Sequence, residues 1–216
     1  MSEGIFFACQ YQSILDSCIL LNYRAVLLLG LFEQTDIVHI DPITHVIKQA
    51  EYLPSPNKNQ RPDEALIDLI VIHNISLPPG QYGGGYVQKF FLNQLDTHSH
   101  PYFESIESLC VSSHLLIERD GELTQFVPFN ERAWHAGESI YQQRTACNDF
   151  SIGIELEGTD SEAYTTQQYD KLNQVLACLI AHYPSLRADK IVGHNDISPG
   201  RKTDPGHAFE WSRIKV

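Results

Sequence analysis

Two histidines and one aspartate stand where strands are expected to end, and these residue types can hold a catalytic metal ion. His73 closes one apolar run, His194 closes another, and Asp204 lies in the loop that follows. Two neutral imidazoles and one carboxylate leave a fourth position on zinc open for water, and they keep the charge low enough for that water to ionise readily. The pattern predicts a hydrolytic zinc site at His73, His194 and Asp204.

A plainer interpretation of the same residues also stands. The chain has 216 residues and 10 histidines, so some of them occupy strand ends by chance. Histidines in such places often do no more than bond to the loop around them. Residue type and position alone leave both interpretations open.

Composition narrows the class of partner. The chain carries 27 acidic and 15 basic residues, so its average surface repels phosphate backbones and anionic lipid headgroups. Nucleic acid is therefore not an expected partner. The five cysteines form no Cys-x-x-Cys pair, and their odd number leaves a free thiol. This usage favours a reducing compartment, and we expect the protein in the cytoplasm.

One apolar run, residues 18–32, needs a separate interpretation. It is interrupted by Arg24, and acidic Glu3 and Asp16 precede it in place of basic residues. A secretory signal begins with basic residues, and a membrane-spanning helix needs about 20 apolar residues. Neither an export signal nor a membrane anchor is expected.

The candidate ligands need strands to position them. Residues 67–73 form a short run rich in β-branched residues, which predicts a strand buried on both faces. Residues 113–117 and 123–127 are apolar runs joined through Asp120 and Gly121, which predicts a hairpin. These elements, with those that follow, indicate one compact α/β domain.

A further strand and several helices complete the expected domain. In residues 150–156, apolar side chains alternate with Ser151, Gly153 and Glu155, so that strand has one polar face. Helical spacing from Thr165 or Thr166 to about residue 182 predicts a long helix. Shorter helices are expected at residues 85–95 and 208–215, and a last strand at 190–192 is expected to deliver Gly193 and His194 into a loop.

Four blocks of the chain carry a family resemblance, in order and with matching spacing. They are HNISLPPG at 73–80, AWHAG at 133–137, NDFSIGIELEGTD at 148–160 and GHNDISPGRKTDPG at 193–206. Together they resemble the cytosolic 1,6-anhydro-N-acetylmuramoyl-L-alanine amidases from about residue 52 to the end of the chain. The resemblance implies a mixed β-sheet flanked by helices, a fold shared with phage amidases and peptidoglycan recognition proteins. It also implies zinc on His73, His194 and Asp204.

The resemblance further implies two residues for the chemistry. Glu155 matches the carboxylate that takes a proton from the attacking water and passes it to the leaving amine. Lys202 matches a cation near the scissile carbonyl, where it shares the charge of the transition state. Strand alternation puts Glu157 on the same face as Glu155, so an exchange of roles between the two stays open, as does a merely solvated Lys202.

Other residues are expected around the substrate. Trp134 and Tyr102 offer aromatic faces to a sugar ring, and Asn74 offers a polar group to its hydroxyls. His135 is expected to line the cleft, whereas each of these could equally be ordinary packing. His114 is expected to be a satisfied interior histidine.

The chain also departs from the family pattern. Cys110 and Ala146 stand where one branch of that family has arginines, which leaves Arg144 and Arg201 as candidate anchors for peptide carboxylates.

The domain prediction divides the chain at residue 45. Residues 46–216 form the zinc amidase domain, and residues 1–45 are an N-terminal extension without a recognised counterpart. Met1 is the only methionine, so an alternative start would read a valine or leucine codon, and Val38 is the best-placed candidate.

We expect hydrolysis of the amide between (1,6-anhydro-)N-acetylmuramic acid and L-alanine of small muropeptides, in cell-wall recycling. The alternatives are an amidase acting on intact peptidoglycan and a peptidoglycan-binding module without catalysis. The presence of all three ligands, Glu155 and Lys202 argues against the binding module.

Overall fold

A computed structural model describes residues 38–62 and 65–216 of the chain. A compact unit runs from Val38 to Val216. The apolar run at 18–32 lies outside the described residues, so its interpretation stays a prediction. No helix in the described part of the chain has both the length and the apolar character needed to cross a membrane.

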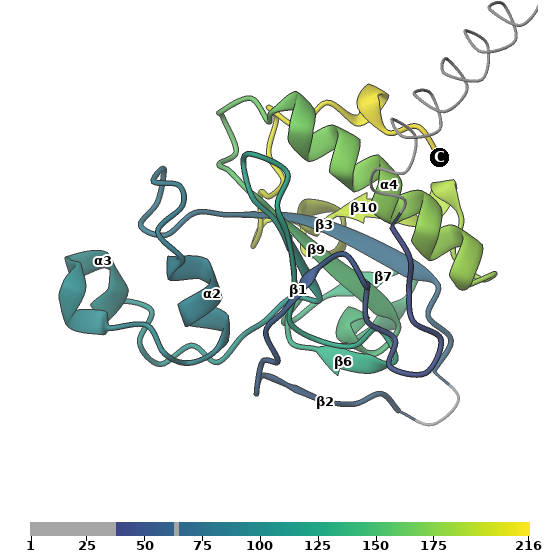
Figure 1. Cartoon of the computed structure of the whole chain (residues 1–216), viewed down its shortest axis with the longest axis horizontal. Coiled ribbons are helices and arrows are strands. Elements are labelled where there is room, and N and C mark those ends of the chain that lie inside the picture. The colour runs from purple at the N-terminus through teal and green to yellow at the C-terminus, as the bar shows by residue number, and fades with distance from the viewer. Residues whose placement is uncertain (1–37, 63–64) are drawn as a thin grey trace, which may run out of the picture. The chain divides into compact units, whose positions relative to one another are not determined.

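The centre of the unit is a six-stranded mixed sheet (Figure 1). Its strands lie in the order β1, β5, β4, β9, β3, β10, and every neighbouring pair is parallel except β4 with β5. Their bounds are β1 Glu51–Tyr52, β3 Leu69–Ile75, β4 Leu115–Ile117, β5 Leu123–Gln125, β9 Ser151–Glu157 and β10 Ile191–Gly193. This confirms the predicted mixed sheet and the predicted hairpin, with Gly121 at a φ of 89° in its turn.

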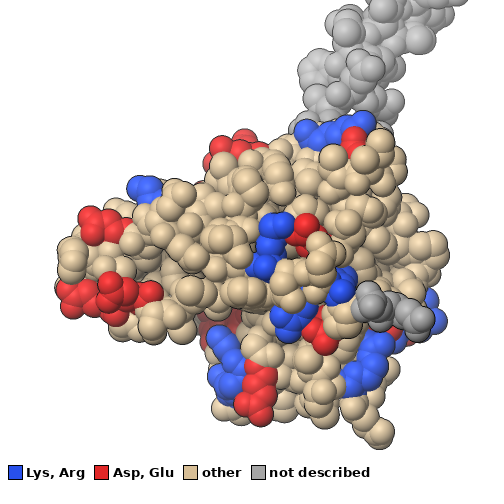
Figure 2. All heavy atoms as spheres, turned by 90° about the horizontal axis from the view of Figure 1, so that it is seen from below, with Lys and Arg blue, Asp and Glu red and all other residues tan. Residues whose placement is uncertain are grey.

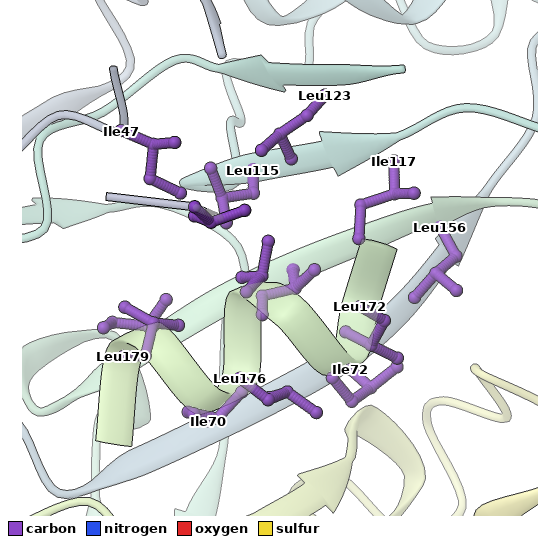
Figure 3. Packing of buried hydrophobic residues seen from close by; sticks show 14 of the residues in the cluster. Ile47, Ile70, Ile72, Leu115, Ile117, Leu123, Leu156, Leu172, Leu176 and Leu179 are labelled. Carbon is purple, nitrogen blue, oxygen red and sulfur yellow. The ribbon is translucent and has the colours of Figure 1, made fainter. Parts of the chain in front are cut away.

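One face of the sheet packs against α4, Thr166–His182. Ile70 and Ile72 of β3 point to this helix, as do Ile152 and Ile154 of β9, because alternate residues of a strand share a face. Figure 3 shows these layers meeting through the leucines of α4. Fully burying each such side chain contributes roughly 1.5–3 kcal/mol. This interface contains the largest cluster of buried apolar residues in the described part of the chain, so it is the main core.

The opposite face of β3 and β9 is apolar at one end and polar at the other. Leu69 and Val71 pack there against Phe150, but the next residue of β3 on this face is His73. On β9 the series continues to Glu155. Because parallel strands end together, both polar residues lie at the carboxyl edge of the sheet, where open α/β sheets usually bind ligands.

A smaller core lies under the segment that contains α2, Tyr86–Phe91, and α3, Pro101–Glu104. Leu116 of β4 and Phe103 of α3 are both buried in it. Figure 2 shows acidic side chains gathered at the end of the molecule formed by this segment. The remaining short elements are β2 Lys58–Gln60, β6 Glu131–Ala133, β7 Ile140–Tyr141, β8 Arg144–Thr145, η1 Thr97–Ser99, η2 Cys147–Asp149, η3 Ala188–Lys190, η4 Trp211–Arg213 and α5 His194–Ile197.

Residues just before the predicted domain boundary pack into the main core. Val38 is 3% exposed and Ile40 is 9% exposed, and both lie in the cluster that α4 covers. The backbone of His45 also accepts a hydrogen bond from Phe129. In the described part of the chain, residues 38–45 therefore belong to the same compact unit as the residues after 45.

The helix predicted at 208–215 is wrong, since this segment contains only the single turn η4. Two of its backbone amides bond to side chains of α4: the amide of Glu210 donates to the hydroxyl of Tyr169, and the amide of Lys215 donates to Asn173. Tertiary contacts thus override the local helical pattern.

Other boundaries also differ from the prediction. The strand predicted at 67–73 is β3 at Leu69–Ile75, so His73 lies two residues before its end. The helix expected at 85–95 ends at Phe91, because Asn93 takes a left-handed conformation with a φ of 56°. His194 does not lie in a loop but begins α5.

The N-terminus of α4 provides a test of the local structure. The hydroxyl of Thr165 accepts from the amide of Gln168 and donates to the carbonyl of Arg119. Thr165→Ala removes both bonds, and we expect the free energy of unfolding to fall by about 1–2 kcal/mol in urea denaturation. Thr166→Ala, one residue along, is the control and changes it by less than about 0.5 kcal/mol. Equal effects of the two substitutions would contradict this account of the cap.

Candidate active site

Three candidate ligand atoms converge at the carboxyl edge of the sheet. The Nδ1 atoms of His73 and His194 are 2.9 Å apart, and each is 3.0 Å from Oδ2 of Asp204. Tetrahedral zinc with bonds of about 2.0–2.1 Å holds its ligands only slightly farther apart, at about 3.3 Å. The three residues therefore fit a metal ion bound on one side of this triangle, with a coordination position left open.

The three atoms arrive from two strands and a loop. His73 lies near the end of β3, and His194 follows β10, which pairs directly with β3. The amide of Asn195 donates to the carbonyl of Asp204 at 3.0 Å, which ties the loop to the start of α5. A Cβ on Gly206 would lie 2.1 Å from Cα of Asp160, so only glycine fits where this loop passes the segment that follows β9. Local packing thus holds Asp204 against the histidines.

The charge states of the triad suit a metal. Burial lowers the pKa of His73 to about 4, which keeps the imidazole neutral. Burial acts to raise the pKa of Asp204, but the contacts of its Oδ2 with Nδ1 of His194 and Nδ1 of His73 outweigh it and hold that pKa well below its usual range. Metal ligands must be deprotonated, and neither of these two groups needs to lose a proton near neutral pH.

Glu155 lies directly beside the triad. It is the register partner of His73 in the parallel pairing of β9 with β3. The residue is 8% exposed, and its Oε2 is buried without a hydrogen-bond partner among the described residues. Burial, then the charge of Asp204, raises the pKa of Glu155 well above its ordinary value. An unpaired buried carboxylate oxygen is costly, and perturbed acids in clefts are candidates for proton transfer.

Glu157, the alternative carboxylate, is already bonded to the protein. Its Oε1 accepts from the amide of Gly83 at 2.5 Å, and its Oε2 accepts from the amide of Arg119 at 3.3 Å. It does not border the cleft that contains the triad. The geometry therefore favours Glu155 over Glu157 for a role at the metal.

A cleft of about 620 Å³ opens over these groups, a size typical of small-molecule sites. Ten of the residues predicted for the site border it: the candidate metal ligands His73, His194 and Asp204, the chemical pair Glu155 and Lys202, and Asn74, Tyr102, Trp134, His135 and Arg201. Lys202 is exposed at the rim.

Several of the predicted substrate contacts also bond within the protein. The amide of Asn74 donates to Asp160 and to the carbonyl of Pro205. The indole of Trp134 donates to Asn59 at 2.6 Å. Arg201 donates to the carbonyls of Ala136 and Glu138. These bonds fix the walls of the cleft, whatever the side chains do for a ligand.

The other candidate anchor, Arg144, does not border the cleft. Its guanidinium forms a bidentate pair with Asp68, at 2.7 and 3.1 Å, and lies 3.6 Å from the ring centre of Phe150. The bidentate partner is thus within the protein, and the hypothesis that Arg144 anchors a peptide carboxylate is wrong for this structure.

Sequence reasoning gave no role to Asn148. Its Oδ1 accepts from the backbone amides of His135 and Ala136, at 3.1 and 2.8 Å, beside the cleft. Asn148 opens one of the four blocks that carry the family resemblance, which is the only signal it had, and no spacing rule connects it to residues 135 and 136.

The family model for N-acetylmuramoyl-L-alanine amidases matches residues 61–207. The chain belongs to this family. It is an amidase, and the predictions of its family, enzyme class and fold are confirmed. Catalysis by the family sets aside the alternative of a binding module without activity.

Close relatives support the same assignment. The chain is 55% identical to the 1,6-anhydro-N-acetylmuramyl-L-alanine amidase AmpD of Enterobacter cloacae, over 76% of this chain and 88% of that protein. It is 54% identical to AmpD of Escherichia coli strain K12, over 77% of this chain and 91% of that protein.

Solved structures agree with the fold. The crystal structure of a selenomethionine AmpD derivative matches with a TM-score of 0.77 and 52% identity, covering 79% of this chain and 95% of that one. The E. coli amidase AmiD, in complex with the substrate anhydro-N-acetylmuramic acid-L-Ala-D-γ-Glu-L-Lys, matches with a TM-score of 0.51 and 29% identity, covering 72% of this chain and 60% of that one.

His114 is an interior histidine, as predicted. Its Nδ1 accepts from the amide of Gly153 at 3.0 Å, and its Nε2 lies 3.1 Å from the carbonyl of Glu131. Burial, then the nearby charge of Arg61, lowers its pKa well below the ordinary value.

This shift predicts a pH dependence of stability. As pH falls below about 6.5, the unfolded chain binds a proton at His114 that the folded chain does not bind, so the free energy of unfolding falls. In His114→Asn the amide keeps an acceptor for Gly153 and does not titrate, so the dependence is shallower. Urea unfolding of both proteins between about pH 5 and pH 8, with a metal chelator present, measures the difference. Parallel curves would show that His114 does not contribute.

Proposed function

We propose that this amidase uses zinc to cleave the amide between 1,6-anhydro-N-acetylmuramic acid and L-alanine of small muropeptides in the cytoplasm, as a step of cell-wall recycling. The observation that carries the proposal is the triangle of His73 Nδ1, His194 Nδ1 and Asp204 Oδ2 beside the buried Glu155. The substrate is inferred from relatives more than 50% identical that carry the name 1,6-anhydro-N-acetylmuramyl-L-alanine amidase.

The triad supplies the donor set for zinc. Bound zinc acts as a Lewis acid that polarises the scissile carbonyl and makes a water molecule more acidic. The two imidazoles and the single carboxylate hold the ion without cancelling its charge. Burial of both histidines excludes bulk water from two sides of the site.

Glu155 moves the proton. Glu155 lines the cleft, and its Oε2 has no hydrogen-bond partner among the described residues, so it takes a proton from the attacking water and delivers it to the nitrogen of the leaving L-alanine. The raised pKa of Glu155 suits this exchange, because the protonated acid stays populated long enough to protonate the amine.

Lys202 stabilises charge. Lys202 borders the cleft, and its ammonium has no ion-pair partner among residues 38–62 and 65–216, which the structure describes. A free ammonium at the rim can share the negative charge that grows on the carbonyl oxygen in the transition state.

Substitutions separate metal binding from proton transfer. Asp204→Ala is expected to lose both zinc and cleavage of anhydro-muropeptide. Glu155→Gln is expected to keep zinc and lose cleavage by about 10²–10⁴-fold, since an amide cannot accept the proton. Metal analysis and product chromatography measure the two properties. Glu157→Gln is the matched control one step along the strand, and it retains activity within a few-fold.

Two results would contradict these roles. Unchanged cleavage in Asp204→Ala rules out the metal assignment. Loss of cleavage in Glu157→Gln together with retention in Glu155→Gln reverses the roles of the two carboxylates.

The substrate class has its own test. Wild-type protein is incubated with anhydro-muropeptide and, separately, with intact sacculi, and release of peptide is followed. We expect a clear preference for anhydro-muropeptide. Preference for sacculi would favour the alternative of an amidase acting on intact peptidoglycan.

We also propose that the catalytic domain begins at residue 38 and that residues 1–37 are not needed for catalysis. Removal of residues 1–37 is expected to leave activity and thermal stability unchanged. Removal of residues 1–45 is expected to lower stability, because it also deletes the buried Val38 and Ile40. Comparison of the melting temperatures of the two shortened chains decides between a boundary at 38 and one at 46.

A further inference from the structure

A fourth histidine, His135, bonds to a candidate ligand without belonging to the triad. Its Nδ1 lies 2.9 Å from Nε2 of His73, the ring nitrogen that faces away from the metal site. Its Nε2 lies 3.1 Å from Oγ of Ser151. The same Oγ lies 2.6 Å from the carbonyl of Cys147. These contacts form one chain from a backbone carbonyl to His73.

The direction of every hydrogen bond in this series follows from the carbonyl of Cys147, at which the series ends. A carbonyl oxygen only accepts, so the single hydroxyl proton of Ser151 points to Cys147. The oxygen of Ser151 then accepts from Nε2–H of His135. Neutral His135 is left with a lone pair on Nδ1, which accepts from Nε2–H of His73. The lone pair of His73 therefore lies on Nδ1, the atom beside His194 and Asp204.

The second candidate ligand, His194, is oriented by Ala136, the residue that follows His135. Nε2 of His194 lies 3.0 Å from the carbonyl of Ala136, so this nitrogen carries the proton and Nδ1 carries the lone pair. Both ligand histidines are thus held in one tautomer by two consecutive residues, His135 and Ala136.

The ring of His135 and its loop are themselves fixed. The buried side chain of Asn148 accepts from the backbone amides of His135 and Ala136. A Cβ on Gly153 would lie 2.5 Å from the ring of His135, so the ring lies closely against the backbone of β9 and has no room for rotation toward it. The acceptor therefore exists before any metal arrives.

We propose that His135 is a positioning residue that sets the tautomer of His73 for metal binding, through a relay that ends at Ser151 and the carbonyl of Cys147. The inference rests on the zinc site of the proposed function. Partners of this kind usually change metal affinity 10- to 100-fold when they are removed.

The decisive experiment compares three substitutions in the full chain by zinc titration against a chromophoric chelator. His135→Ala removes the acceptor and is expected to weaken zinc binding about 10- to 100-fold. His135→Asn places an amide oxygen at the position of Nδ1 and restores most of the affinity. His39→Ala, at an exposed histidine, is the control and leaves the affinity unchanged.

The outcomes separate this inference from the proposed function. A wild-type protein that binds no zinc overturns the proposed function itself. Zinc binding in the wild type with equal affinities for all the variants overturns only the role of His135. Equal loss in His135→Ala and His135→Asn also overturns it, because packing alone would then explain the effect.

A second measurement needs no substitution and so does not depend on the folding of a variant. Nitrogen-15 NMR of the imidazoles in the zinc-loaded wild-type protein is expected to show His135 protonated on Nε2 and unprotonated on Nδ1. The opposite tautomer would reverse the direction of the relay and contradict the inference.

Discussion

The parallel pairing of β3 with β9 is the constraint on which the site depends. It places His73 beside Glu155 and sends both side chains to the face opposite α4. A slip of one residue would turn either strand over, with an imidazole or a carboxylate in the main core and an isoleucine in the cleft. The isoleucines that fill the core therefore also decide which face carries the chemistry, so folding and the construction of the active site are one requirement.

Burial at the carboxyl edge of the sheet acts on the two kinds of group in opposite directions. It lowers the pKa of His73, and it raises the pKa of Glu155. Asp204 escapes the same effect because two imidazoles lie against its carboxylate. One environment thus yields a neutral imidazole at His73, an ionised carboxylate at Asp204 and a carboxyl group at Glu155 that is suited to carrying a proton. Partners, rather than residue type, distinguish the two carboxylates.

The short loop around His135 and Ala136 connects the chemistry to the rest of the fold. The ring of His135 contacts His73, and the carbonyl of Ala136 contacts His194. The side chain of Asn148 accepts a hydrogen bond from the backbone amide of Ala136. Arg201, on the same loop segment as Lys202, bonds to that carbonyl as well. The same loop therefore holds the two candidate ligand histidines in place and supports the wall of the cleft at Arg201.

The sequence by itself predicted the sheet, the hairpin, the long helix, the family and ten of the residues that border the cleft, because strand periodicity and ordered motif blocks are local properties of the chain. The sequence pattern wrongly predicted a helix at 208–215, where backbone amides bond to Tyr169 and Asn173 of α4. It left Glu155 and Glu157 as alternatives, which only their different partners distinguish. The relay from Cys147 to His73 was likewise decided by tertiary structure, since hydrogen bonds between residues far apart in the chain depend on how strands and loops pack in space.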